Sequence, residues 1–442
     1  MKHKIGLTHW LRLVSALAGV SLLVVACAGQ VSTEVPPPTQ TPATQVSQPT
    51  KIPTQVSEPT KTPTEETPKV IKIGIHALLG GPDSVGSITI FNGAVLAIEQ
   101  ANQQKMLPGY TIEYQMLDDT TPTTGQADPA QAATNARTFI ADPTVLFAIG
   151  PQFSGLNKAT APLYSQAGMV NISPSATNPD LTNPAFKAEF RPSGKPGFLR
   201  VCSTDALQAP GIANYAYNVL NVRKVYIIDD GSAFGMGTAD AFEARAKEKG
   251  IQILGRDQVD PNAADYSTIL TKVAALEPDA IFYGGHTLAG AKLAMQMKSL
   301  MPDVFGLSTD GIAGADFVQS AGAAGEGWYV TLAAPYLESI PAAAQFIKDF
   351  TARFNTPPVA YSGLSFDAVN TGLSAIKSLI EAGKPLTREN VRDAILGIEY
   401  SGITGKISFD ENGDRVQKII TIWQTTAAVP EGIKYVADAP QE

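Results

Sequence analysis

Cysteine and histidine are scarce in this chain of 442 residues. It has two cysteines, Cys27 and Cys202, and of its four histidines only His76 and His286 lie beyond the first ten residues. A serine-type triad therefore has few candidate bases, and a histidine-rich metal site is disfavoured. Neither a G-x-x-x-x-G-K-[ST] loop nor a G-x-S-x-G elbow occurs, so nucleotide hydrolysis and esterase chemistry lack support. We expect a protein that is not an enzyme and that needs no metal or cofactor.

Basic residues are also outnumbered, with 33 Lys and Arg against 41 Asp and Glu. Three of the cations fall within the first 27 residues, which contain no acidic residue, so the remainder has thirty basic residues against 41 acidic ones, a net charge of about −11. This balance argues against nucleic acid or an anionic membrane surface as a partner. Cys202 has only Cys27 as another cysteine, so we expect it to be a buried small apolar residue.

The first 27 residues have the pattern of a secretory signal. Lys2, Lys4 and Arg12 precede an apolar run over 13–26, which is too short for a comfortable membrane span. Cys27 follows Val–Val–Ala, and this ending resembles the lipobox of bacterial lipoproteins. The resemblance implies that Cys27 is lipidated and becomes the mature N-terminus. The alternative is an uncleaved anchor in which the cysteine is incidental.

Residues 28–69 are rich in Pro, Thr, Gln, Ser and Val, and they repeat loosely around QVS-x-PTK-x-PT. This stretch has no aromatic residue and no helical periodicity, so it cannot bury enough apolar surface to offset the entropy of ordering. We predict a disordered tether between Cys27 and a globular body. Such a tether would span roughly 35 Å as a coil and about 130 Å when fully extended.

Beyond residue 69, strand-like and helix-like segments alternate, which predicts parallel sheets flanked by helices. The strand-like segments are 70–78, 111–119, 145–150, 224–230, 251–259, 278–285 and 303–310. The helix-like segments are 92–102, 129–141, 238–250 and 266–278. Asp265 is a candidate N-cap for the last of these helices, and Gly250 is a candidate stop for the one before it. The length of the body favours two lobes rather than one core.

Loops rich in Gly, Ser and Thr follow the predicted strands, at the edge where α/β sheets bind ligands. They are LLGGPDSVG (78–86), GPQFSG (150–155), NISPSATNP (171–179), YGGHTLAG (283–290) and STDGIAG (308–314). Most lead into helix starts, whose free N–H groups suit a carboxylate ligand. Asp310 adds a carboxylate among Gly, Ser and Thr. Donors on one side and a carboxylate on the other would match a zwitterion, since each buried charge needs a partner.

From Ile71 to about Gln424 the chain resembles the periplasmic leucine/isoleucine/valine-binding family, the type I solute-binding proteins of ABC importers. The segments that carry the resemblance include IKIGIHALLGGP, AIGPQFSG, NISPSATNPDLT, VYIIDDGSAFGMG and FGLSTDGIAG. It implies an α/β fold of the type I periplasmic-binding-protein class, with two Rossmann-like lobes joined by a three-strand hinge. The implied boundaries are 70–199 with 335–412 for the first lobe, 200–334 with 413–428 for the second, and a tail at 429–442.

The resemblance also implies the ligand-binding residues. Ser154, Ser175 and Thr177 would receive the α-carboxylate and α-ammonium of an amino acid, and Asp310 would complete the ammonium site. Phe234 falls where the family commonly has a tyrosine that closes over the ligand. The other residues expected at the pocket are Phe153, His286, Tyr361 and Val85. Four departures from the family leave open whether the ligand has an aliphatic side chain. They are His286 in place of tyrosine, Asp310 in place of glutamate, a shorter first loop and the absence of the first-lobe disulfide.

Each of these residues also has a structural alternative, because loop hydroxyls often bond their own backbone and aromatic residues often lie in the core. We expect an extracytoplasmic, lipid-anchored and monomeric receptor that feeds ABC permease subunits. Its ligand would be an amino acid, amide, urea or short peptide, bound by closure of the hinge. A sensory receptor without a transport role and, less favoured, a hydrolase are the alternatives.

Overall fold

The structure, a computed structural model, describes residues 69–440, which belong to one compact unit. Residues 1–68 lie outside the described residues, and with them the signal sequence expected over 1–27, the lipidation expected at Cys27 and the expected tether as far as residue 68. Lys69, which was expected to end the tether, is the first residue of the first strand. Within residues 69–440, no helix combines the length and the apolar character needed to cross a bilayer.

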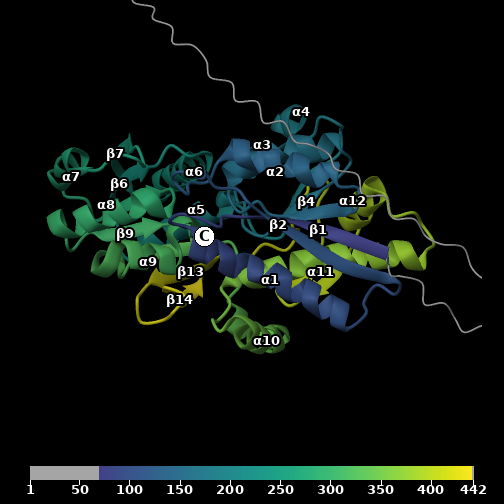
Figure 1. Ribbon diagram of the computed structural model, residues 1–442. Helices are drawn as coiled ribbons and strands as arrows, with labels where there is room; N and C mark the ends of the chain where they lie inside the picture. Colours follow the sequence, from purple (N-terminus) through teal and green to yellow (C-terminus); the bar gives the residue numbers. More distant parts are fainter. Residues whose placement is uncertain (1–68, 441–442) are drawn as a thin grey trace, which may run out of the picture. The chain divides into compact units, whose positions relative to one another are not determined.

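Five parallel strands form the first sheet, in the order β2-β1-β3-β4-β5 (Figure 1). Every residue of β3 is buried, as is typical of a parallel strand with helices on both faces. The predicted strands at 70–78, 111–119 and 145–150 are confirmed, whereas β4 and β5 have three residues each and are too short to show a periodicity. The bounds are β1 (Lys69–Ala77), β2 (Tyr110–Asp118), β3 (Val145–Ile149), β4 (Asn171–Ser173) and β5 (Phe198–Arg200).

Helices cover both faces of this sheet (Figure 1). On one face α2 (Pro129–Ala141) packs against α3 (Ser154–Gln166), and on the other α1 (Ser84–Gln103) packs against α11 (Ala360–Glu381). The first sheet and its helices are called the first lobe here. The lobe also contains α4 (Lys187–Phe190), α10 (Ala344–Phe354), α12 (Arg388–Leu396) and a small hairpin of β11 (Tyr400–Gly402) and β12 (Gly405–Ile407).

Seven strands form the second sheet, in the order β14-β13-β10-β9-β8-β6-β7. The strands from β10 to β7 are parallel, as predicted, but β13 pairs antiparallel with both β10 and β14. Residues 429–442 were expected to be a tail, yet β14 lies within them and belongs to this sheet. The bounds are β6 (Lys224–Asp229), β7 (Gln252–Gln258), β8 (Ala280–Gly284), β9 (Phe305–Ser308), β10 (Tyr329–Leu332), β13 (Thr421–Thr425) and β14 (Ile433–Asp438).

The helices of the second sheet complete what is called the second lobe here. They are α5 (Asp205–Asn218), α6 (Ala233–Lys249), α7 (Ser267–Ala274), α8 (Thr287–Leu300) and α9 (Ala315–Ala321). Short 3₁₀ turns lie at η1 (Pro179–Leu181), η2 (Pro184–Phe186), η3 (Asp310–Ile312), η4 (Gly322–Gly325), η5 (Leu337–Ser339) and η6 (Pro341–Ala343). Gly250 ends α6 with a φ of 82°, a left-handed conformation that glycine adopts without a Cβ clash. Asp265 accepts the N–H of Ser267 at 2.6 Å, so its side chain caps α7 from one residue before the N-cap position.

The chain passes between the two sheets three times: after β5, after β10 and before β13. Ser203 ties the three crossing segments together, since its N–H donates to Ala333 O at 3.0 Å and its hydroxyl bonds both the N–H and the carbonyl of Ile419. Arg200 is fully buried beside them and pairs with Asp414 at 2.7 Å. These contacts hold the crossing strands side by side, which is the arrangement a hinge requires.

Candidate functional site

A cavity of about 300 Å³ lies where the carboxyl ends of both sheets meet. Its walls come from the loops after β1, β3 and β4 in the first lobe and from the loops after β6, β8 and β9 in the second. The first turns of α1, α3, α6 and α8 also line it, and their free N–H groups favour negative charge. Of the predicted site residues, the ones that line this cavity are Val85, Phe153, Ser154, Ser175, Phe234, His286, Asp310 and Tyr361.

The hydroxyls of the first lobe shape the loop and also reach the cavity. Ser154 is the first residue of α3, and its Oγ accepts the N–H of Asn178 at 3.2 Å. The Ser175 hydroxyl donates to Gln152 O at 3.1 Å, which leaves its lone pairs free to accept. Thr177 does not line the cavity, although its Oγ1 is buried and has no hydrogen-bond partner among residues 69–440. The carbonyl of Thr177 accepts the N–H of Asp205 at 3.0 Å.

Asp310 begins η3, directly after β9, and its carboxylate is held from two sides. Tyr361 of the first lobe donates its hydroxyl to Oδ2 at 2.5 Å, and Gln208 on α5 donates Nε2 to Oδ1 at 2.9 Å. Burial raises the pKa of Asp310 to about 6, because these hydrogen bonds do not fully replace water around the charge. A carboxylate in this setting gains stability from a cation brought by a ligand.

A second carboxyl group, which the sequence reasoning missed, lies behind Asp310. Asp205 is fully buried, and its Oδ1 accepts the same Gln208 amide at 3.1 Å, so one side chain bridges both acids. Burial, followed by the charge of Asp310, raises the pKa of Asp205 to about 8. The only sequence signal was an Asp followed three residues later by Gln at a helix start, a pattern that ordinary capping also produces.

Three of the predicted aromatic side chains stack across the cavity. The His286 ring lies between Phe153 of the first lobe, at 3.9 Å between ring centroids, and Phe234 of the second, at 4.9 Å. The interplanar angles are 16° and 26°, so both contacts are stacked. His286 donates its backbone N–H to Asp230 Oδ2 at 2.9 Å, which fixes the start of α8. The stack therefore joins the two lobes at the site.

A second contact between the lobes lies near Val85, which is half-exposed. The N–H of Gly86, in the first turn of α1, donates to Asp316 Oδ2 in α9 at 2.7 Å. A Cβ on Gly86 would lie 2.7 Å from the same oxygen, so only glycine permits this approach. Asp83 and Asp316 both line the cavity, and neither was singled out from the sequence.

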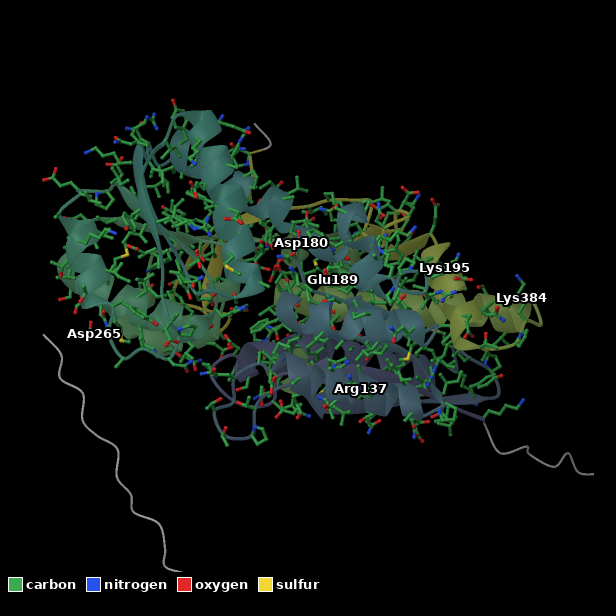
Figure 2. The ribbon with its side chains drawn as sticks, turned by 90° about the horizontal axis from the view of Figure 1, so that it is seen from above. Arg137, Asp180, Glu189, Lys195, Asp265 and Lys384 are labelled. Atoms are coloured by element: carbon green, nitrogen blue, oxygen red, sulfur yellow. The ribbon has the colours of Figure 1, made fainter. Side chains whose placement is uncertain are left out.

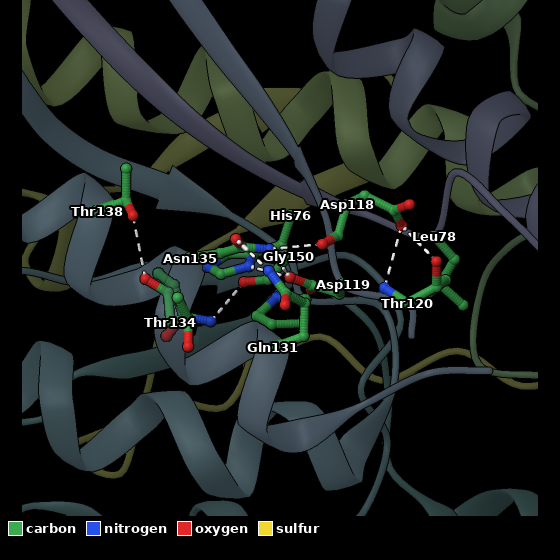
Figure 3. Close-up of polar contacts among 12 residues, drawn as sticks. His76, Leu78, Asp118, Asp119, Thr120, Gln131, Thr134, Asn135, Thr138 and Gly150 are labelled. Carbon is green, nitrogen blue, oxygen red and sulfur yellow. Dashed lines mark hydrogen bonds and ion pairs between the residues drawn. The ribbon is translucent and has the colours of Figure 1, made fainter. Parts of the chain in front are cut away.

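The other histidine of the body lies apart from the cavity lining (Figure 3). His76 bonds Asp119 at 2.9 Å and the Tyr164 hydroxyl at 2.7 Å, and Asn135 donates to the same Asp119 oxygen. All four side chains are buried inside the first lobe, where no substrate could reach them. The cluster joins β1 to α2 and α3, which is a structural role. Among residues 69–440, no group of three or more His, Cys, Asp or Glu could hold a metal ion.

Comparison with known proteins extends over nearly all of the described chain. A family model described as "Periplasmic binding protein" matches residues 70–428. The Leu/Ile/Val-binding protein BraC3 of Rhizobium johnstonii is 27% identical over 358 residues, which cover 81% of this chain and 92% of that protein.

Solved structures are similar over the same region. The leucine binding protein LivK of Thermotoga maritima is 24% identical with a TM-score of 0.73, covering 84% of this chain and 99% of that one. LivJ of Streptococcus pneumoniae, in complex with isoleucine, is 25% identical with a TM-score of 0.72, covering 84% of this chain and all of that one. The fold is thus the type I periplasmic-binding-protein fold expected from the sequence, and the chain belongs to the periplasmic binding protein family.

Proposed function

We propose that this protein is the solute-binding receptor of an ABC importer and binds an amino acid or a close analogue, such as an amide, urea or a short peptide. The observation that carries the proposal is the cavity, whose wall combines the Ser154 hydroxyl and several helix starts with the partly buried carboxylate of Asp310. Relatives named for leucine, isoleucine and valine binding support the ligand class.

The ligand carboxylate would lie against the first lobe. Ser154 accepts a hydrogen bond from Asn178, so its own proton is free to point at a ligand oxygen. The start of α3 adds backbone N–H groups and the positive end of the helix dipole. Ser175 lies beside them with its lone pairs free for the ligand ammonium. Thr177 would support this loop from behind.

The ligand ammonium would pair with Asp310 of the second lobe. Tyr361 and Gln208 hold the two oxygens of that carboxylate, so its direction is set before a ligand arrives. An ammonium group favours the charged form of Asp310 and lowers its pKa from about 6. Binding of amine-bearing ligands should therefore strengthen as the pH rises through 6 and weaken below it.

Closure of the two lobes would complete the site. We place the lobe boundaries near residues 200, 334 and 412, where the chain crosses between the sheets. The Phe153–His286 stack and the Gly86–Asp316 hydrogen bond form only when the lobes meet, so a ligand that strengthens them favours the closed state. Phe234 and Val85 would enclose the ligand side chain.

The rest of the proposal concerns placement and partners. The protein would be held at the extracytoplasmic face of the cell envelope by a lipid on Cys27, act as a monomer and deliver its ligand to permease subunits. We propose binding without catalysis. The only histidine in the cavity wall, His286, is held in a stack, and its Nδ1 has no partner among residues 69–440.

The test is identification of the bound compound, followed by one matched pair of variants. Mass spectrometry of small molecules released from the full-length chain should recover a compound with a carboxylate and an ammonium. Asp310→Asn should weaken its binding by at least about thirtyfold, the loss typical of a buried ion pair that loses one partner. Asp303→Asn, the same change at an exposed position, should have no effect. Unchanged affinity in Asp310→Asn would remove Asp310 from the site.

A further inference from the structure

The walls of the cavity are acidic and contain no lysine or arginine. Asp83 lies in the first lobe, while Asp310, Asp316 and Glu431 lie in the second. None of these four forms an ion pair with a basic side chain of residues 69–440. The basic side chains labelled in Figure 2 are exposed at the surface instead: Arg137, Lys195 and Lys384.

Two of these carboxyl groups, Asp83 and Asp316, line the cavity from opposite lobes. Asp316 accepts the N–H of Gly86 at 2.7 Å, which brings it to the start of α1, close to Asp83. Burial, together with the nearby charge of Asp83, raises the pKa of Asp316 to about 6. Burial also raises the pKa of Asp83. Two carboxylates pressed together on closure repel each other unless a proton or a cation lies between them.

Further atoms around the cavity lack hydrogen-bond donors. Gln152 Oε1 and His286 Nδ1 belong to residues of the wall, and both are buried without a partner in the described part of the chain. Gln152 Oε1 can only accept a hydrogen bond, so it favours a ligand with N–H groups, because an unsatisfied buried acceptor costs free energy.

An amino-acid ligand with a neutral side chain would leave the negative charge of the cavity wall unbalanced. The α-groups of an amino acid bring one cation, which Asp310 takes, and one anion, which the helix starts of the first lobe take. The carboxyl groups of Asp83 and Asp316 then stay without a cation. We propose that the bound amino acid carries a second positive charge on its side chain, as arginine, lysine and ornithine do, held between Asp83 and Asp316. This inference rests on the proposed function for the position of the α-groups.

Matched ligands separate charge from shape. L-arginine and L-citrulline have nearly the same shape, but only arginine is cationic, and L-lysine and L-norleucine form a second such pair. Calorimetric titration of the full-length chain should give a dissociation constant at least about tenfold lower for one cationic ligand than for its neutral partner, equivalent to about 1.4 kcal/mol. Asp316→Asn and Asp83→Asn should bring this ratio close to one. Asp303→Asn should keep the ratio of the unmodified protein.

The outcomes distinguish this inference from the function on which it rests. If citrulline or norleucine binds as tightly as its cationic partner, the second positive charge is excluded and the amino-acid receptor stands. If only agmatine and cadaverine bind, the cationic class stands and the amino-acid assignment falls. If neither amino acids nor these amines bind, both are overturned. A ratio that persists in Asp83→Asn and Asp316→Asn would also overturn the inference, because another group would then read the charge.

Discussion

Replacement of Asp205 by asparagine tests the pair of buried carboxyl groups behind the cavity. Asp205 is fully buried, has one hydrogen bond to Gln208 Nε2 at 3.1 Å and lies near the charge of Asp310. Burial and that charge raise its pKa from 3.8 to about 8. At neutral pH the folded protein therefore keeps a proton that the unfolded chain has released. As a result, the free energy of unfolding falls as the pH rises from about 4 to about 8.

The size of the effect follows from the shift. A pH of 7 lies about three units above the unfolded-state pKa of 3.8. At 1.36 kcal/mol per unit, keeping the proton in the folded state therefore costs roughly 4 kcal/mol. Asparagine does not titrate and keeps an oxygen for Gln208, but its N–H₂ group brings two donors where the protonated Asp205 had one, at an oxygen without a partner. An unsatisfied donor costs about 1–3 kcal/mol. Asp205→Asn should thus stabilise the ligand-free protein by about 1–3 kcal/mol at pH 7, by more at pH 8 and not at all near pH 4.

The assay is urea unfolding, followed by tryptophan fluorescence, at several pH values between 4.5 and 8. Asp303→Asn provides the control, because it removes a carboxylate from an exposed position. The difference between Asp205→Asn and the unmodified protein should grow with pH, while the control difference stays flat. A variant that is destabilised equally at every pH would refute the reasoning, since Asp205 would then be charged and paired in the folded state.

Three further predictions concern contacts around the cavity and the hinge. Gly86→Ala places a Cβ 2.7 Å from Asp316 Oδ2 and should weaken ligand binding about tenfold, as measured by calorimetry. Gly155→Ala is the control, because a Cβ there meets nothing within 4 Å and should not change the affinity. Equal affinities of the two variants would contradict a role for the Gly86–Asp316 contact in binding. Cys202 is fully buried, and burial raises the pKa of its thiol to about 12. Iodoacetamide at pH 8 should therefore label Cys202 only after the protein is unfolded, which peptide mapping can show. Labelling of the native protein would contradict the burial of this thiol. Arg200→Met removes the ion pair with the partly buried Asp414 and the buried hydrogen bonds to Ala176 O and Thr182 Oγ1. It should lower the free energy of unfolding by about 3–5 kcal/mol in urea, and a loss below about 1 kcal/mol would contradict the importance of these contacts.

The periodic segments of the body were predictable because their hydrophobic pattern repeats over many residues. β1, β2 and β3 each follow such a segment, as do β6, β7, β8 and β9 of the second sheet, whereas β10 was not predicted. The antiparallel strand β14 was not predicted, since its residues Ile433–Asp438 alternate only weakly and lie at the end of the chain. It forms a strand because β13 offers an edge with unpaired backbone groups, a fact of the sheet and not of the segment.

The sequence predicted which loops line the cavity, but it did not predict which of their residues contact one another. In the loop NISPSATNP (171–179), Ser175 donates its hydroxyl to the backbone of the neighbouring loop and also lines the cavity, so the ligand-binding role expected of it stays a prediction. The bridge from Gln208 to Asp310 joins residues 102 positions apart, and the contact of Gly86 with Asp316 joins residues 230 apart. No local sequence pattern predicts a contact between residues so far apart in the chain. The roles of Asp205, Asp83 and Asp316 could therefore not be predicted from the sequence.

The sequence by itself determined the alternation of strands and helices, and with it the edge of the sheets where small hydroxyls and helix starts collect. Those properties are local, since they depend on residue spacing and on where strands end. Only the tertiary structure decided that four carboxyl groups share one cavity without a lysine or arginine. The charge of a cavity depends on which distant loops meet there and on how much water they exclude, and both are set by the docking of the lobes.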